Sequence, residues 1–166
     1  MDKEVDPMAF RPMRRNKQAL PLETCIEILK TEPRGVLSVL GEDGYPYGMP
    51  INQYYCLENG RLYFHTAREG HRLDAIRAHD KVSLCVYDQG YRKEGEWAWN
   101  ISSVIVFGHI REVEDQSQGL AMLRELARKF TDDEGYIDHE LTSAAPRVMI
   151  LELIPDHITG KLVKEQ

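Results

Sequence analysis

The chain has 166 residues, of which 42% are hydrophobic and 29% charged, and this length suits one domain with a core of its own. Its 21 Lys and Arg against 27 Asp and Glu give a formal net charge of -6, which argues against nucleic acid as the main partner. No apolar run approaches the ~18 residues that cross a bilayer, and the first residues lack a signal peptide's apolar stretch. We therefore expect a cytoplasmic protein with no membrane partner.

The three cysteines predict reduced thiols. Cys25, Cys56 and Cys85 are widely spaced inside apolar segments, and the sequence contains no CxxC pair. None of them has a His or Cys at the spacing of a metal site, so we expect buried, unpaired thiols and no metal.

The first half of the chain predicts an arm, a helix and three strands. Residues 1–18 are expected to form an irregular basic arm, and residues 19–166 a single domain. Pro46 and Pro50 lie inside a predicted strand over 45–57, and because proline cannot donate to a sheet, that strand should bend, lie at an edge or face a ligand. The expected elements are a helix over 21–32, strands over 35–40, 45–57 and 61–66, and tight turns at Asp43-Gly44 and Asn59-Gly60.

The second half alternates strands with longer helices. The expected elements are a helix over 70–78, a strand over 81–87, a polar loop over 88–100, a strand over 102–113, a helix over 116–130 and a strand over 147–153. Early hairpins favour antiparallel pairing. The pattern therefore predicts a mainly β fold, an antiparallel barrel of about six strands with helices packed outside.

The junction after the third strand is a candidate phosphate site. The strand ends in His65 and Thr66, and a helix opened by Gly70 follows with Arg68, His71 and Arg72 around its first turn. Free N–H groups at a helix start attract anions, and two guanidinium groups and a threonine hydroxyl beside them would complete a phosphate cradle. The alternative is an ordinary strand–helix junction whose charges face solvent.

Two other segments are candidates for ligand contact. The proline-interrupted strand around Met49–Asn52 leaves backbone groups free for a planar heterocycle, unless it is only an edge strand at a barrel corner. Trp97 and Trp99 lie in the polar loop, where exposed aromatics often form a lid or a subunit contact, or where one of them plugs the barrel end. Ser103, at the start of the next strand, either binds a ligand or finishes the loop.

Motifs of several enzyme classes are missing. The sequence has no GxGxxG, GxxxxGK[ST], HExxH or GxSxG pattern, so P-loop phosphoryl transfer and covalent hydrolysis have no motif support.

Taken together, several segments resemble the pyridoxamine 5′-phosphate oxidase-like, FMN-binding split-barrel superfamily, and within it the 5-nitroimidazole-resistance-type proteins. The likeness extends over about residues 13–161 and depends on the order and spacing of its motifs. The segments that carry it are Met13–Arg15, Gly35–Val39, Asp43–Pro50, Tyr63–Ala67 with Gly70 and Arg72, Ser103–Gly108, and Ile158–Lys161.

The resemblance implies a split barrel that binds FMN, and a homodimer with the flavin at the subunit interface. It places the Met49–Asn52 backbone at the flavin ring, His65, Thr66 and Ala67 at the ribityl and phosphate side, and Arg72 on the phosphate. Ser103, with Trp97 or Trp99, would reach the flavin from one subunit or the other. Together with the helix start, the candidate cofactor-binding residues are Met49, Pro50, Ile51, Asn52, His65, Thr66, Ala67, His71, Arg72, Trp97, Trp99 and Ser103.

This chain departs from the family pattern at three points. Arg72 stands where the family usually has Lys, which keeps the charge and adds a planar fork. Ile101 and Ser102 replace an aromatic and a basic residue that often precede the strand serine. Basic substrate-binding residues near the C-terminus are not evident, so the resemblance does not extend to pyridoxamine phosphate oxidase activity itself.

The resulting hypothesis is an FMN-dependent oxidoreductase that exchanges electrons with a small molecule, a nitro-aromatic or quinone-like compound by family likeness. No catalytic residue is identified; His65 and His71 are candidate acid–base groups because histidine titrates near neutrality, and the alternative for either is a structural or phosphate-side histidine. One alternative is a non-catalytic barrel that binds or senses flavin, haem or a deazaflavin. The other is a nucleic-acid-binding barrel that uses the Arg11–Lys17 arm, which the negative net charge disfavours.

Overall fold

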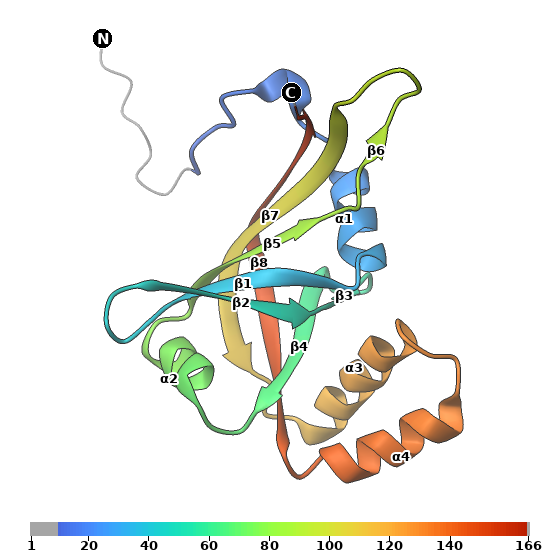
Figure 1. Cartoon of the computed structure of the whole chain (residues 1–166). Helices are drawn as coiled ribbons and strands as arrows, with labels where there is room; N and C mark the ends of the chain where they lie inside the picture. The colour runs from blue at the N-terminus through green and yellow to red at the C-terminus, as the bar shows by residue number, and fades with distance from the viewer. Residues whose placement is uncertain (1–9, 166) are drawn as a thin grey trace.

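The structure is a computed structural model that describes residues 10–165, so the predicted arm over residues 1–18 lies partly outside the described residues (Figure 1). The described end of the arm is irregular apart from a short 3-10 helix, Asn16–Gln18. The helices are α1 (Leu22–Thr31), α2 (His71–Ala78), α3 (Gln116–Arg128) and α4 (Glu134–Ala144). The strands are β1 (Arg34–Leu40), β2 (Pro46–Asn52), β3 (Tyr54–Cys56), β4 (Arg61–Ala67), β5 (Lys81–Tyr87), β6 (Tyr91–Arg92), β7 (Trp99–Glu112) and β8 (Val148–Lys164).

All strands join one curled antiparallel sheet in the order β2-β1-β5-β7-β8-β4-β3, and β6 pairs with β7. β2 and β4 approach each other without a ladder between them, so the barrel is split at this point. The predicted mainly β, antiparallel fold is confirmed, with eight strands instead of about six.

The core fills the inside of the curled sheet. It consists of inward-facing side chains of the long strands, and α1 adds Cys25, Ile28 and Leu29 to it. Each of these apolar side chains contributes about 1.5–3 kcal/mol when fully buried. The core therefore fixes the strands that carry the candidate site.

The predicted strand over 45–57 is two strands, because the chain turns at Gln53. The Gln53 side chain is fully buried and donates from Nε2 to the carbonyl oxygen of Glu32 at 2.9 Å. The Lys129 ammonium donates to the carbonyl oxygens of both Glu32 and Gln53 at 2.8 Å. These bonds hold the end of α1, the end of β2 and the end of α3 together, and burial lowers the pKa of Lys129 to about 8.

β8 runs ten residues or so beyond the end predicted at Leu153 and passes through Pro155, because a bulge accommodates the proline. The ladder to β7 shifts between Phe107 and Gly108, with Gly108 opposite Pro155. A Cβ on Gly108 would lie 2.3 Å from the carbonyl oxygen of Ile154, so only glycine fits there.

Three smaller features can also be compared with the prediction. Helix α4 was not predicted, although Asp133 caps it by accepting from the N–H of Tyr136 at 3.0 Å. The Asn59-Gly60 hairpin is confirmed, with positive φ at Gly60 alone. All three cysteines are free, and Cys85 is only partly buried.

Candidate functional site

The candidate site starts at β2, an edge strand. β2 forms a regular ladder with β1 from Asn52 opposite Arg34 to Pro46 opposite Leu40, and no other strand of residues 10–165 pairs with it. Proline has no N–H to donate to a neighbouring strand. An edge strand tolerates Pro46 and Pro50 because no hydrogen bond is lost where the nitrogen faces away from the ladder. β2 is therefore an edge strand, and contact with a ligand at its unpaired backbone groups stays a prediction.

Arg72, in the first turn of α2, contacts β2 through Met49. Its Nε lies 2.9 Å from Sδ of the buried Met49. A thioether is a weak acceptor, and within the described part of the chain no carboxylate pairs with this half-buried guanidinium. Arg72 therefore has donors to spare for an anion.

His65, near the end of β4, is influenced by Arg72. Its imidazole keeps access to solvent, yet the surrounding protein and the positive charge of Arg72 both lower its pKa. This direction favours the neutral imidazole, which has one ring nitrogen as donor and the other as acceptor. A neutral ring adds no positive charge to the site but can hydrogen-bond a polar edge.

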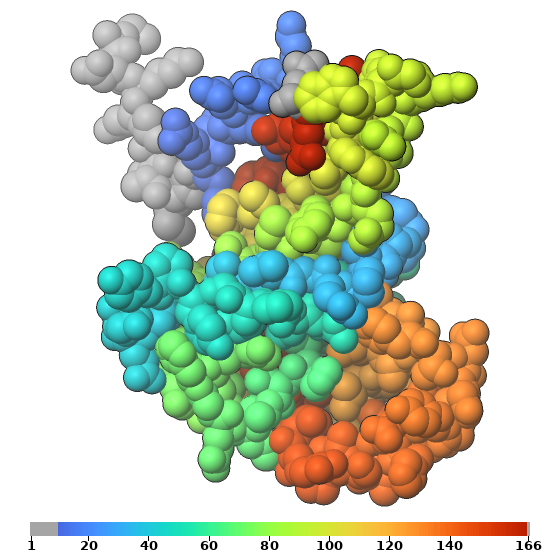
Figure 2. Space-filling view, viewed as in Figure 1, coloured from blue at the N-terminus to red at the C-terminus, as the bar shows by residue number. Residues whose placement is uncertain are grey.

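The start of α2 lies beside β2. Gly70 precedes the helix with φ 123°, a conformation that favours glycine, and it offers no side chain to cap the first N–H groups. The His71 ring stacks on Tyr47 of β2 with 4.4 Å between centroids. In Figure 2 the β1–β2 hairpin (cyan) lies directly above α2 (green) on the same face. The edge of β2 with Met49, the side chains of His65, His71 and Arg72, and the start of α2 therefore lie together. We call this group the Met49–Arg72 cluster.

The remaining predicted residues of β2 and β4 differ in which of their atoms a ligand could contact. Pro50 and Ala67 are exposed and Asn52 is half-buried, so each can reach a ligand with its side chain. Ile51 belongs to the core and can contribute only its backbone. Thr66 is 8% exposed, so little of its hydroxyl is open to solvent.

Ser103, Trp97 and Trp99 lie elsewhere within one chain. β1 and β5 separate β7 from β2, and Ser103 is paired with Lys161, eight residues beyond the end of the β8 segment that pairs with β4. Measured across the sheet, Met49, Leu37, Leu84 and Val106 are successive cross-strand neighbours, and Ser103 lies three residues along β7 from Val106. Three strand spacings and three residues therefore separate Met49 from Ser103, on the order of 15–20 Å. Trp97 and Trp99 are 71% and 43% exposed, so neither plugs the barrel. Trp99 instead lies under the guanidinium of Arg92.

Tyr47 is a site residue that sequence reasoning missed. Its ring fixes His71 against β2, but nothing in the pattern Tyr45-Pro46-Tyr47 says which tyrosine turns inward: Tyr45 is 73% exposed and Tyr47 is half-buried. Residues i and i+2 of a strand share a face, so alternation alone cannot separate the two tyrosines. They differ because Tyr45 precedes β2, whereas Tyr47 lies inside it on the same face as Met49 and Ile51.

Two further observations concern the described residues 10–165. They contain no group of three His, Cys, Asp or Glu side chains placed to hold a metal ion. None of their helices has both the length and the apolar character needed to cross a membrane.

Comparison with known sequences gives one family match. The model of the pyridoxamine 5′-phosphate oxidase family matches residues 21–162, which include every candidate residue of the site. No curated protein matches the sequence at a significant level.

Solved structures share the fold at low sequence identity. A protein provisionally described as a 5-nitroimidazole antibiotic resistance protein, from Bacteroides thetaiotaomicron, is 20% identical with a TM-score of 0.75, covering 89% of this chain and 87% of its own. An FAD-binding protein from Mesorhizobium loti is 21% identical with a TM-score of 0.61, covering 87% and 96%. An FAD- and haem-binding protein from Mycobacterium smegmatis is 19% identical with a TM-score of 0.67, covering 87% and 73%.

Proposed function

The chain belongs to the pyridoxamine 5′-phosphate oxidase family, and from this premise we propose that it is an FMN-dependent oxidoreductase that acts on a small molecule. The observation that carries the proposal is Arg72, a half-buried guanidinium held against the thioether of Met49 with no carboxylate partner among residues 10–165. Two similar structures are described as FAD-binding proteins, which supports a flavin as the cofactor.

The residues of the cluster suit a flavin mononucleotide. Arg72 and the uncapped start of α2 offer charge and N–H donors to a terminal phosphate. Met49 offers an apolar contact, and the free edge of β2 offers backbone donors and acceptors to the polar edge of a flat ring. FMN ends in a phosphate and carries such a ring, so we propose FMN as the cofactor.

When bound, the flavin supplies the electron-transfer chemistry, and the chain supplies position, access and electrostatics. Arg72 would hold the phosphate, and the stacked pair Tyr47–His71 would keep the helix start against β2. His65 would donate or accept one hydrogen bond as a neutral imidazole, since burial and Arg72 lower its pKa. A nitro-aromatic or quinone-like acceptor is our proposal for the substrate class, and it follows the nitroimidazole-resistance likeness.

We propose that the working unit is a homodimer with the flavin at the interface. The outer face of β1, β5 and β7 exposes large apolar side chains, Val36, Tyr87, Ile105 and Phe107. Val36, Cys85 and Ile105 are direct cross-strand neighbours, so this apolar surface is continuous. A second copy on this face could also bring Ser103 or a tryptophan to the Met49–Arg72 cluster, which one chain does not do.

A second candidate is a non-catalytic module for flavin, haem or a deazaflavin. The similar M. smegmatis structure described as binding both FAD and haem favours this candidate. His65 is the residue of the cluster that could serve as an axial haem ligand. Turnover separates the two functions, because a binding module would not pass electrons to an acceptor.

The test is anaerobic. FMN-loaded protein is reduced chemically, mixed with a nitro-aromatic or a quinone, and followed by the return of flavin absorbance. Stoichiometric reoxidation faster than that of free reduced FMN supports the oxidoreductase. Reoxidation no faster than free FMN, with FMN still bound, would leave only the binding module.

A further inference from the structure

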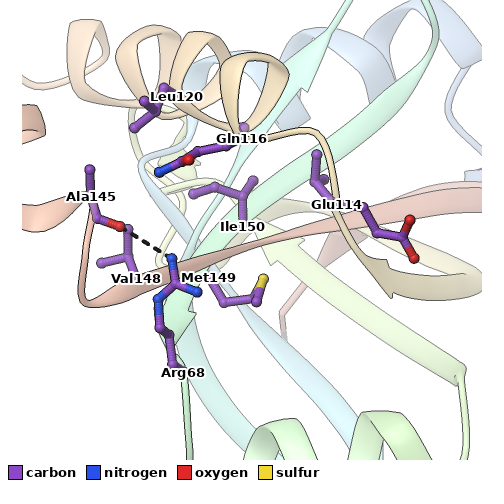
Figure 3. Close-up of a pocket in the computed structure, with 10 residues that line it drawn as sticks. Arg68, Glu114, Gln116, Leu120, Ala145, Val148, Met149 and Ile150 are labelled. Atoms are coloured by element: carbon purple, nitrogen blue, oxygen red, sulfur yellow. Dashed lines mark hydrogen bonds between the residues drawn. The ribbon is translucent and has the colours of Figure 1, made fainter.

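A cavity of about 220 Å³ lies where the end of β4, the start of β8 and the start of α3 meet (Figure 3). It shares no lining residue with the Met49–Arg72 cluster but adjoins it, because Val148, Met149 and Ile150 are the cross-strand partners of Ala67, Thr66 and His65. Polar and apolar atoms contribute about equally to its lining, and the apolar part comes from Val113, Leu120, Val148, Met149 and Ile150. The polar groups at its edge are Arg68, Glu114, Gln116 and Ala145.

Arg68 is the cation of this cavity. In Figure 3 its guanidinium turns toward the loop before β8, where it donates to the carbonyl oxygen of Ala145 at 3.4 Å. That distance is beyond the usual range of an N–H···O bond, so the contact is weak. Within residues 10–165 no carboxylate pairs with Arg68, whereas Arg61 and Arg77 each reach one at 2.7 Å. Most donors of Arg68 are therefore free.

The other polar groups leave room for an anion. Figure 3 shows the carboxylate of Glu114 pointing away from Arg68, and the amide of Gln116 extending across the cavity. Leu120, Val148 and Ile150 form the apolar wall. The floor is tight, because a Cβ on Gly119 would lie 3.2 Å from Cγ1 of Ile150. One cation beside an apolar wall suits a ligand with one negative charge and an apolar body.

We propose that this cavity binds a small monocarboxylate with a flat or compact apolar body. The carboxylate would take a bidentate pair of hydrogen bonds from Arg68, with Gln116 as a further donor. The body would lie against Leu120, Val148 and Ile150. An apolar cavity of about 150 Å³ already accepts benzene, so a volume of about 220 Å³ has room for a ring with a carboxylate. This site does not depend on the flavin.

The test titrates benzoate into the full chain by calorimetry, with benzamide as the neutral probe of the same shape. Arg68→Gln keeps a polar side chain but removes the charge and the fork. Arg147→Gln is the matched control, since Arg147 is exposed and lies close in sequence to the cavity, and within residues 10–165 its guanidinium bonds only to Ser143. We expect benzoate to bind the wild type and Arg147→Gln equally, and Arg68→Gln at least about tenfold more weakly.

Benzamide should likewise bind the wild type at least about tenfold more weakly than benzoate, because it cannot form the ionic pair. The proposal is overturned if the wild type does not bind benzoate at millimolar concentration. It is also overturned if Arg68→Gln or benzamide matches the affinity of the wild type for benzoate, since the charge of Arg68 would then play no part.

Discussion

Replacing Arg72 by alanine should weaken FMN binding strongly without unfolding the protein. In the structure Arg72 contacts Met49 through Nε, which leaves its terminal N–H groups for the phosphate. One lost charge-assisted hydrogen bond costs about 1.5–3 kcal/mol, and about 1.4 kcal/mol is a tenfold change, so the dissociation constant should rise about ten- to 150-fold. Since Arg72 is half-buried and partly screened by water, we expect the lower part of this range.

The assay is a fluorescence titration of apoprotein with FMN and, separately, with riboflavin, which lacks the phosphate. If Arg72 binds the phosphate, Arg72→Ala should impair FMN binding and leave riboflavin binding nearly unchanged. Arg72→Lys should fall between the two proteins, because it keeps the charge and loses the fork. Arg77→Ala, on the same helix but paired with Glu112 at 2.7 Å, is the control and should bind FMN like the wild type.

Two results would refute this reasoning. Equal FMN affinity of the wild type and Arg72→Ala would remove Arg72 from the site. An equal loss for FMN and riboflavin would show that the substitution disturbs the ring pocket or the fold instead of a phosphate contact.

Two further predictions concern stability and assembly. Because burial lowers the pKa of Lys129 to about 8, the unfolded chain binds more protons than the folded chain from about pH 8 to the ordinary lysine pKa near 10.5. The unfolding free energy of the wild type should therefore rise with pH in this window relative to that of Lys129→Met. Urea denaturation at several pH values measures both, and parallel pH profiles of the two proteins would contradict the prediction. Ile105→Asp, on the exposed β1–β5–β7 face, should give a monomer by light scattering with weakened FMN binding, while Tyr136→Asp on α4 should remain dimeric. A wild type that is monomeric with full FMN occupancy would rule out the shared site.

Much of the fold could be predicted because local signals were strong. The strand over 81–87 matches β5, and the helix expected over 21–32 matches α1, which Pro21 and Pro33 bracket. Asp-Gly and Asn-Gly placed the two hairpins, and Gly70 marked the start of α2. In each case one or two residues act on the backbone next to them, so the sequence alone carries the information.

The remaining differences arise from long-range contacts. The break at Gln53 depends on hydrogen bonds to Glu32 and on Lys129, which is 76 residues away. The extension of β8 past Pro155 depends on Gly108 in another strand. No local pattern can signal either contact.

The same distinction holds for the candidate site. The sequence grouped His65, His71 and Arg72 because they are close in the chain, but it could not pair Arg72 with Met49 or His71 with Tyr47. Nor could it show that Ser103 lies far from this cluster within one chain.

The central claim, that the chain is a flavoprotein, is tested most directly by the visible absorption spectrum of the purified protein. The chromophore is then released by denaturation and identified by mass. The account predicts the two-band spectrum of an oxidised flavin and the mass of FMN. A colourless protein that also fails to bind added FMN would contradict it.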